Sequence, residues 1–176
     1  MVNLITSTEH LQAFCSKAAK SDYITVDTEF LRERTYYSKL CLIQIAFQGD
    51  GISDSALIDV LSENINLKAF YDLLLNENIL KVFHAARQDL EIFFHEKNIF
   101  PKPFFDTQVA AMVCGFGDQV GYETLVKKLA LVAIDKTSRF TNWSQRPLSD
   151  QQLKYAIADV TPVSYTHLTL PTILLV

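Results

Sequence analysis

Hydrophobic and polar side chains alternate along residues 23–30, and this period of two predicts a β-strand. One face of the strand would carry apolar side chains, and the other would carry the carboxylates of Asp27 and Glu29. Two further β-rich runs, 41–47 and 55–60, follow in the chain. Three strands in succession predict an antiparallel meander.

The pattern changes after residue 60, where stretches of helical periodicity alternate with a short apolar run over 79–83. Asp106 is typical of a helix N-cap, and Ser149 begins a capping box. A meander followed by alternating helices and strands predicts an α/β domain with a mixed β-sheet flanked by helices. Helices are predicted over 67–75, 86–97, 107–114 and 121–130, and from Asp150 onward.

The composition indicates one packed domain. With 176 residues, of which 49% are hydrophobic and 20% charged, the chain is neither disordered nor a low-complexity repeat. Its 16 basic and 20 acidic residues give a net charge of −4, which excludes nucleic-acid binding through a uniformly basic surface. Any contact with a nucleic acid must therefore be local.

Cysteine usage and hydropathy bear on the compartment. The three cysteines are far apart and form no C-x-x-C motif, so the sequence indicates neither a disulfide framework nor a zinc site. It has no N-terminal signal pattern and no apolar run of the roughly 18 residues that a membrane span requires. These features predict a cytoplasmic protein without membrane association.

The last stretch, 160–176, differs from the rest because it holds no Asp, Glu, Lys or Arg. Prolines interrupt it, and it fits neither a membrane span nor an amphipathic helix. We therefore expect one domain over residues 1–161 and an uncharged tail over 162–176. A cloning-derived or frame-shifted end is one explanation for this tail.

Two carboxylates project from the same face of the first predicted strand, because Asp27 and Glu29 are two residues apart. About two such pairs are expected by chance in a chain this acidic, so the pair alone also fits an exposed strand face. The apolar residues on both sides favour a central strand, where an unpaired carboxylate is unfavourable.

Two more acids stand at positions suited to a site. Asp89 falls early in a predicted helix, near the carboxyl end of the preceding strand, where open α/β sheets bind ligands. Its alternative role is to complement the helix dipole. Tyr155 and Asp159 are four apart on the last predicted helix and can act at one site, although such pairs are also common on helix surfaces.

In this order, the three pieces resemble the exonuclease motifs of the DEDD superfamily, and Tyr155 marks its DEDDy branch. The resemblance to the exonuclease domain of the bacterial ribonuclease D family covers roughly residues 4–161. It implies a ribonuclease H-like mixed sheet, with an antiparallel meander plus parallel strands, and 3′-5′ removal of nucleotides from RNA ends, notably in tRNA maturation. The segments that carry it are 27–37, 42–44, 82–89, 105–108 and 146–149.

Four carboxylates gathered at one site would require cations, since like charges about 4 Å apart repel by on the order of 4 kcal/mol at an effective dielectric of about 20. Oxygen ligands without a Cys or His cluster favour Mg²⁺ or Mn²⁺ over Zn²⁺. Two such ions can stabilise the attacking and leaving oxygens of a phosphoryl displacement. By resemblance, Tyr155 orients the attacking water, and both metals are held by Asp27, Glu29, Asp89 and Asp159.

Two basic-aromatic segments, 31–40 and 136–146, are candidates for contacts with single-stranded RNA. Each is also consistent with a solvated loop anchored by its aromatic side chains. By resemblance, Phe30 packs on the terminal base, and its alternative place is the core. The other candidate RNA contacts are Arg32, Arg34, Tyr36, Lys136, Trp143 and Arg146.

The predicted partner is RNA with a free single-stranded 3′ end, and the resemblance points to tRNA precursors. Ribonuclease D usually carries helical nucleic-acid-binding domains after the exonuclease domain, and we expect none within these 176 residues. His84 and Asp106 are predicted to be structural, Asp106 as a helix cap. Two alternatives stay open: a metal-dependent exonuclease acting on DNA or a small phosphodiester, and a non-catalytic RNA-binding module.

Overall fold

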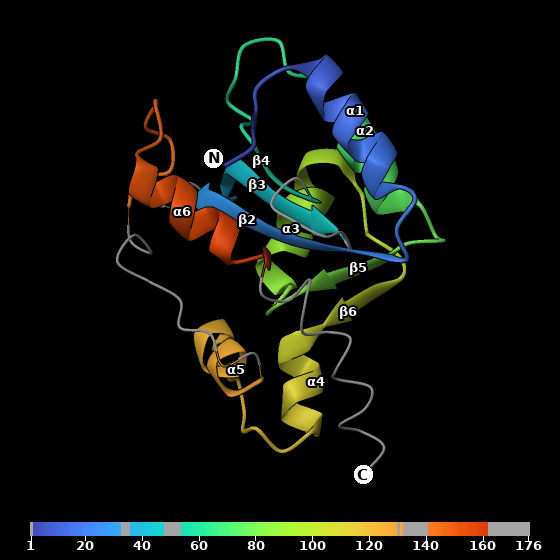
Figure 1. Cartoon of the computed structure of the whole chain (residues 1–176), viewed down its shortest axis with the longest axis vertical. Helices are drawn as coiled ribbons and strands as arrows, with labels where there is room; N and C mark the ends of the chain where they lie inside the picture. The colour runs from blue at the N-terminus through green and yellow to red at the C-terminus, as the bar shows by residue number, and fades with distance from the viewer. Residues whose placement is uncertain (1, 33–35, 48–53, 130, 132–140, 162–176) are drawn as a thin grey trace.

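The computed structural model describes residues 2–32, 36–47, 54–129, 131 and 141–161. Within them, six strands form one sheet: β1 (Leu4–Ile5), β2 (Tyr23–Leu31), β3 (Lys39–Phe47), β4 (Ser55–Ile58), β5 (Leu80–Phe83) and β6 (Phe104–Asp106). Their order is β1-β4-β3-β2-β5-β6 (Figure 1). β2, β3 and β4 pair antiparallel, whereas β1 with β4, β2 with β5, and β5 with β6 pair in parallel. The predicted mixed sheet is confirmed.

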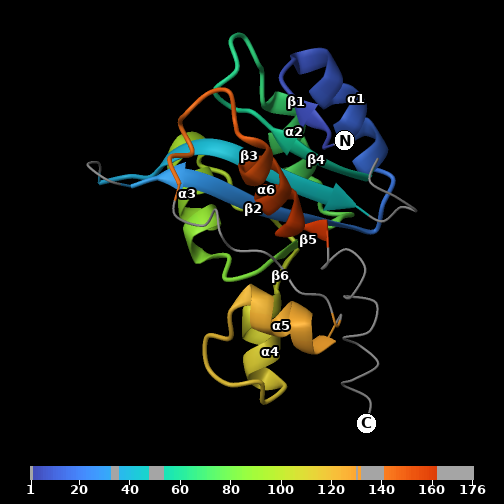
Figure 2. The same cartoon turned by 60° about the vertical axis from the view of Figure 1, so that its left-hand side comes forward.

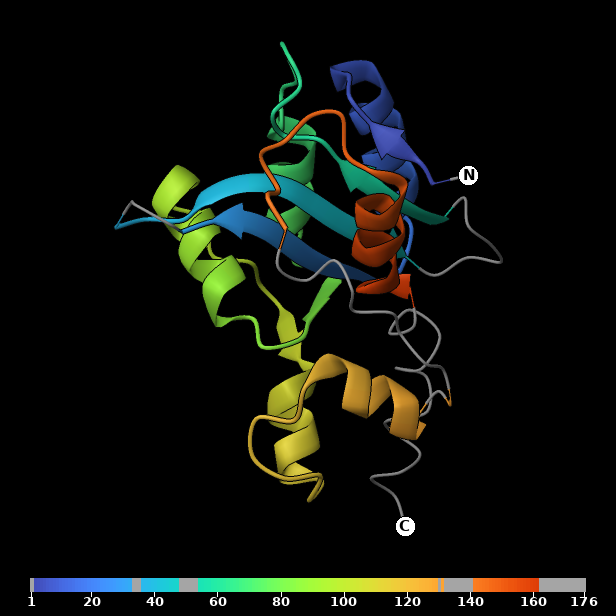
Figure 3. The ribbon, with the colours of Figure 1, turned by 90° about the vertical axis from the view of Figure 1, so that its left-hand side faces the viewer.

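Helices cover both faces of this sheet: α1 (Thr8–Ala18), α2 (Lys68–Leu75), α3 (Arg87–Lys97), α4 (Thr107–Val113), α5 (Tyr122–Leu129) and α6 (Asp150–Ala158). α1, α2 and α3 share one core with the sheet, which includes Phe14, Phe70 and Phe93. α6 packs on the opposite face against Leu42 and Leu57 (Figure 3). α4 and α5 lie together at one end, beyond β6 (Figure 2). No described helix is long and apolar enough to cross a membrane.

Three of these elements, β1, α1 and β6, were not predicted from the sequence. β1 and β6 have only two and three residues, too few to display a period of two. α1 carries a stripe of buried residues, Leu11, Phe14 and Ala18, and Ser7 caps it by accepting a hydrogen bond from the backbone N–H of His10. That stripe is the signal that would have identified α1.

β2 separates the hydrophobic core from the acidic side of the sheet, as its alternating pattern predicts. Ile24 and Val26 are buried in the core beneath α1, α2 and α3. Asp27 and Glu29 lie on the other side, which α6 covers. The pairing of β2 with β3 shifts register between Glu29 and Phe30. Such bulges re-aim side chains, and they are common next to functional sites.

α6 begins where its capping box predicts. The Ser149 hydroxyl accepts a hydrogen bond from the backbone N–H of Gln152 at 3.2 Å, and the Gln152 side-chain oxygen accepts one from the Ser149 N–H at 2.9 Å. The helix ends just before Asp159, its C-cap residue. The Thr25 hydroxyl on β2 then donates to the carbonyl oxygen of Val160 at 3.1 Å. This bond fastens the end of α6 to β2.

A largely buried ion pair fixes the segment that leads into α6. The Arg146 guanidinium donates two hydrogen bonds of 2.7 Å to the Asp59 carboxylate, just after β4. It also donates at 2.8 Å to the carbonyl oxygens of Cys41, Trp143 and Gln145. The Asp59 side chain is 8% exposed and that of Arg146 25% exposed. A bidentate pair in such surroundings is strong and directional, so it holds this segment against β3 and β4.

We expect Asp59→Ala to lower the free energy of unfolding by about 2–4 kcal/mol, because it leaves a largely buried guanidinium without its carboxylate. Urea denaturation of the whole chain measures this loss. The control is Asp72→Ala, which removes an exposed partner of Lys68 and should cost less than about 1 kcal/mol. Equal losses in the two variants would contradict a structural role for the Arg146–Asp59 pair.

Candidate active site

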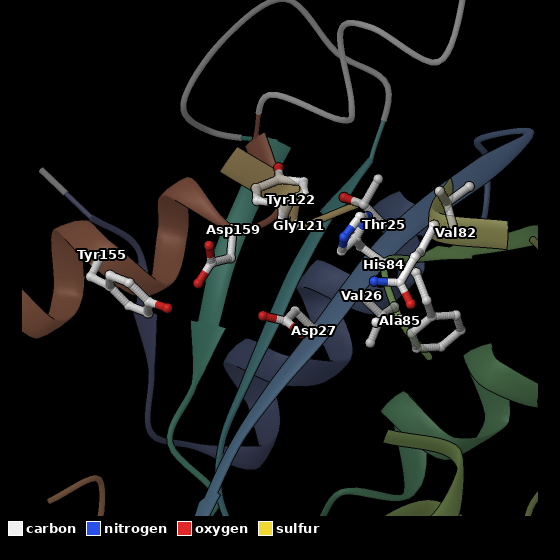
Figure 4. Close-up of a pocket in the computed structure, with 12 residues that line it drawn as sticks. Thr25, Val26, Asp27, Val82, His84, Ala85, Gly121, Tyr122, Tyr155 and Asp159 are labelled. Atoms are coloured by element: carbon white, nitrogen blue, oxygen red, sulfur yellow. The ribbon is translucent and has the colours of Figure 1, made fainter. Parts of the chain in front are cut away.

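A cavity of about 730 Å³ is lined by all five residues that the motifs predict as the site. β2 supplies Asp27 and Glu29, α3 supplies Asp89, and α6 supplies Tyr155 with Asp159 directly after its last turn. Figure 4 shows the carboxylates of Asp27 and Asp159 and the hydroxyl of Tyr155 pointing toward one another. The fold therefore brings together side chains from three distant parts of the chain.

A smaller cavity of about 240 Å³ adjoins the first and shares three of these five residues with it. His84 lines both cavities (Figure 4). Its ring nitrogens lie 2.9 Å from the Thr107 hydroxyl and 3.0 Å from the carbonyl oxygen of Val120. The imidazole is thus held in place by the protein, as the structural prediction for His84 requires.

Burial and mutual repulsion raise the proton affinity of the acidic cluster. Burial raises the pKa of Asp27 well above its usual range, and the charges of Asp89, Asp159 and Glu29 raise it further. Burial likewise raises the pKa of Asp89 to about 7, although the Thr28 hydroxyl donates a hydrogen bond to its carboxylate and favours the ionised form. Asp27 and Asp89 therefore release their protons less readily than ordinary carboxyls, and a cation bound beside them would favour their ionised forms.

The donor set suits a hard divalent cation. All four acids line the same cavity, and among its described lining residues the one imidazole, that of His84, is engaged with protein atoms. Among the described residues, no three acidic, histidine or cysteine side chains converge in a ligand arrangement. These carboxylate oxygens nevertheless suit a Mg²⁺-type ion. Such an ion would also lower the raised pKa of Asp27.

Comparison with known proteins decides the family. The sequence profile described as 3′-5′ exonuclease matches residues 2–174. The chain belongs to this 3′-5′ exonuclease family. The resemblance to DEDD exonucleases and the ribonuclease H-like fold that it implied are therefore confirmed.

Two of the chain's most similar curated relatives are named ribonuclease D. That of Jannaschia sp. (strain CCS1) is 62% identical over 161 residues, which are 92% of this chain and 42% of that protein. That of Nitrobacter hamburgensis is 52% identical over 160 residues, 91% of this chain and 41% of that protein. The chain thus spans about two fifths of these curated relatives.

A solved structure agrees with these relatives. The crystal structure of Escherichia coli RNase D, described as an exoribonuclease involved in structured RNA processing, matches with a TM-score of 0.90 and 34% identity. The match covers 98% of this chain and 45% of that one. The arrangement of sheet and helices described above is therefore the ribonuclease D exonuclease fold.

Several predicted RNA contacts of this exonuclease chain line the cavity, and their environments differ. Arg32 is exposed at its edge. Phe30 lines the cavity and also packs on the core, so its predicted contact with a terminal base stays a prediction. Trp143 is only 3% exposed, and its ring lies 5.9 Å from that of Tyr155. Burial suits Trp143 to support the Tyr155 ring rather than to stack on a base.

The remaining predicted RNA contacts lie elsewhere. Tyr36 is 87% exposed in a neighbouring groove. The Arg146 guanidinium is engaged by Asp59 and three carbonyl oxygens, which favours a structural role for it over an RNA contact. Arg34, Lys136 and the tail over 162–176 lie outside the described residues.

The Asp106 carboxylate has a larger part than the helix cap predicted for it. It accepts a hydrogen bond from the backbone N–H of Gln108 at 2.8 Å, which caps α4 as predicted. It also accepts bonds from the N–H groups of Ala85 and Ala86, at 3.0 and 2.9 Å. These two residues form the turn between β5 and α3, and α3 has no side-chain cap of its own. Asp106 therefore anchors the start of the helix that carries Asp89.

Sequence reasoning missed the residues that complete the site. Thr28 donates to Asp89, and Gln88, Thr141 and Asn142 line the cavity. Only Thr28 left a signal in the sequence, as a polar residue on the apolar face of β2. Gln88 lies in the first turn of α3, beside Asp89, and Thr141 and Asn142 lie in the segment before α6, where no periodicity assigns a direction to a side chain.

The raised pKa of Asp89 predicts the pH dependence of stability without metal. A carboxyl whose pKa rises from 3.8 in the unfolded chain to about 7 stabilises the fold below pH 4, and that contribution disappears as pH rises through about 7. In chelator, thermal unfolding of Asp89→Asn at pH 7.5 should therefore show a gain on the order of 2 kcal/mol over wild type. The gain should be absent at pH 4.

The matched control for this prediction is Asp118→Asn, at an exposed carboxylate outside the site. It should follow wild type at both pH values. If Asp89→Asn and wild type lose stability in parallel between pH 4 and pH 7.5, the idea that Asp89 is held in a repulsive, buried cluster is wrong.

Proposed function

We propose that this chain hydrolyses phosphodiester bonds at the 3′ ends of RNA and removes nucleotides in the 3′-to-5′ direction. The observation that carries the proposal is the single cavity lined by Asp27, Glu29, Asp89, Tyr155 and Asp159. The relatives named ribonuclease D and the exoribonuclease of Escherichia coli support it. The activity is assigned to a chain that spans about two fifths of those proteins.

Members of this family generally use divalent metal ions. We propose two ions, Mg²⁺ or Mn²⁺, held by Asp27, Glu29, Asp89 and Asp159. When bound, such ions stabilise negative charge on the attacking and leaving oxygens of a phosphoryl displacement. The four carboxylates would supply oxygen ligands, and the raised pKa values of Asp27 and Asp89 mean that protons would leave these two groups as the ions bind.

Tyr155 is the side chain placed to position the attacking water. Its hydroxyl points toward Asp27 and Asp159, and the buried Trp143 ring packs beside its own ring. A phenol with an ordinary pKa near 10 is a poor base at neutral pH. It can nevertheless accept and donate hydrogen bonds, so its role is to hold water in line for attack while a carboxylate takes the proton.

The proposed substrate is RNA with a free single-stranded 3′ end, and tRNA precursors in the cytoplasm are the expected physiological case. The net charge of −4 requires that attraction be local. Phe30 and Arg32 at the cavity provide an apolar surface and a guanidinium for the terminal nucleotides. Binding should therefore weaken as salt increases, but less steeply than for a uniformly basic protein.

We expect timed digestion of 5′-labelled RNA to give progressively shorter products with Mg²⁺ or Mn²⁺ and none with chelator. Asp27→Ala and Asp159→Ala should each lower kcat by at least about 10²-fold, because each removes a proposed metal ligand. The control is Asp118→Ala, at an exposed site. Undiminished activity in either site variant would refute the proposed metal site.

Two further measurements distinguish this proposal from an enzyme that does not distinguish RNA from DNA and from a non-catalytic RNA-binding module. Unlabelled DNA of the same sequence competes equally if the chain does not distinguish sugars. A chain that binds labelled RNA but releases no shortened product with either ion would be a non-catalytic RNA-binding module.

Removing the Tyr155 hydroxyl should lower kcat by about 10²-fold, with little change in KM, because the phenol acts on the water rather than on the RNA. Steady-state kinetics of Tyr155→Phe measure this split. Tyr71→Phe is the control, since it removes a hydroxyl that donates to Glu96 on the far side of the sheet. A change confined to KM would instead place the Tyr155 hydroxyl in substrate binding.

A further inference from the structure

A second groove leads away from the active-site cavity. It has a volume of about 880 Å³ and lies between α3 and the hairpin of β2 and β3. Arg32 lines both this groove and the active-site cavity, so the two adjoin at this residue. We call it the hairpin groove, and its described lining residues are Arg32, Tyr36, Tyr37, Arg87, Glu91, Phe94 and His95.

Helix α3 contributes residues to both the hairpin groove and the active-site cavity. Arg87, Glu91, Phe94 and His95 are spaced by four, three and one residues, which sets them along one stripe of α3. Asp89 belongs to another face of the same helix, where it is buried against Thr28. The stripe from Arg87 to His95 rises by about 12 Å along the helix axis. The groove therefore extends outward from the point where α3 contributes to the active site.

The groove is walled by exposed aromatic rings. Tyr36 is 87% exposed, Phe94 58% and Tyr37 57%. The Tyr37 ring lies 3.5 Å from the imidazole of His95, between ring centroids, and 4.8 Å from that of Tyr36. The Tyr37–His95 contact joins the hairpin to α3. Large aromatic side chains gathered at the surface of a protein mark a binding site more often than a structural one.

The charges in the groove suit a phosphate backbone. Two guanidinium groups, those of Arg32 and Arg87, face one carboxylate, that of Glu91, which lies 3.1 Å from Arg87. The Arg87 and Glu91 side chains are 90% and 55% exposed, so their pair contributes little to stability and can be exchanged for another partner. Cations interleaved with exposed rings bind single-stranded nucleic acid by phosphate attraction and base stacking, without sequence preference.

We propose that the hairpin groove binds the single-stranded part of the RNA that lies 5′ of the nucleotides in the active site. The proposal rests on the proposed function, since it assumes a strand whose 3′ end occupies the cavity. Tyr36, Tyr37 and Phe94 stack on bases, and Arg87 contacts a phosphate. A dinucleotide is too short to reach the groove, whereas a longer strand occupies both places.

The test compares binding with cleavage in the whole chain. In chelator, where no cleavage occurs, the Kd of a fluorescently labelled single-stranded RNA oligomer should increase about tenfold in Phe94→Ala, from the loss of one stacking ring. The ratio of kcat/KM for the oligomer to that for a dinucleotide should fall by a similar factor. The control is Leu75→Ala, an exposed apolar side chain at the end of α2 that lines neither the groove nor the active-site cavity and should change neither value.

A charge variant tests the phosphate contact independently. Arg87→Gln should reduce the slope of log Kd against log salt by about 0.7, the value for one phosphate on a single strand. The Arg87–Glu91 pair is exposed, so the variant should unfold at the wild-type urea concentration.

The outcomes separate the two proposals. If the wild type cleaves RNA, and Phe94→Ala and Arg87→Gln bind the oligomer as tightly as the wild type does, the proposal for the hairpin groove is overturned and the proposed function stands. Wild type that binds the oligomer through these residues but cleaves nothing would uphold the groove and overturn the proposed function. Unchanged binding in both variants would also follow if the groove received a protein segment, and that result counts against the proposal.

Discussion

The structure depends on one electrostatic constraint: carboxylates that repel one another must be held at the same place on a sheet. A pair of unit charges about 4 Å apart repels by on the order of 4 kcal/mol at an effective dielectric of about 20, which is comparable to the whole stability of many domains. The chain meets this repulsion with a core on the far face of β2 and with the hydroxyl of Thr28 beside Asp89. Repulsion at the site thus lowers the stability of the fold, and packing in the core compensates for it.

The same constraint explains how an acidic chain can act on a polyanion. Four of the acids that make the net charge negative line one cavity, where divalent ions can neutralise them. Arg32 lies at the edge of that cavity, and Arg87 lies in the neighbouring groove. Attraction for a phosphate backbone is therefore produced by the placement of a few charges, and the net charge says little about it.

Local signals predicted most of the fold, whereas the five candidate site residues were assigned through the family resemblance. Alternation along 23–30 assigned the two faces of β2, and the Ser149 capping box located the start of α6, because both patterns depend on neighbours in sequence. The roles of Arg146 and Trp143 could not be read in this way. Asp59 is far from Arg146 in the chain, and burial of Trp143 follows from packing between α6 and the sheet. Partners of this kind are set by tertiary structure, which no local pattern encodes.

Through the Asp106 carboxylate, the outermost strand of the sheet fixes the start of a helix that contributes to the active site. Because one side chain on β6 holds the first turns of both α3 and α4, these two helices share a single pivot. Asp89 sits within one turn of that pivot, whereas the α4 and α5 lobe extends from its other side. The position of Asp89 thus depends on a side chain at the edge of the sheet, although Asp89 itself faces its centre.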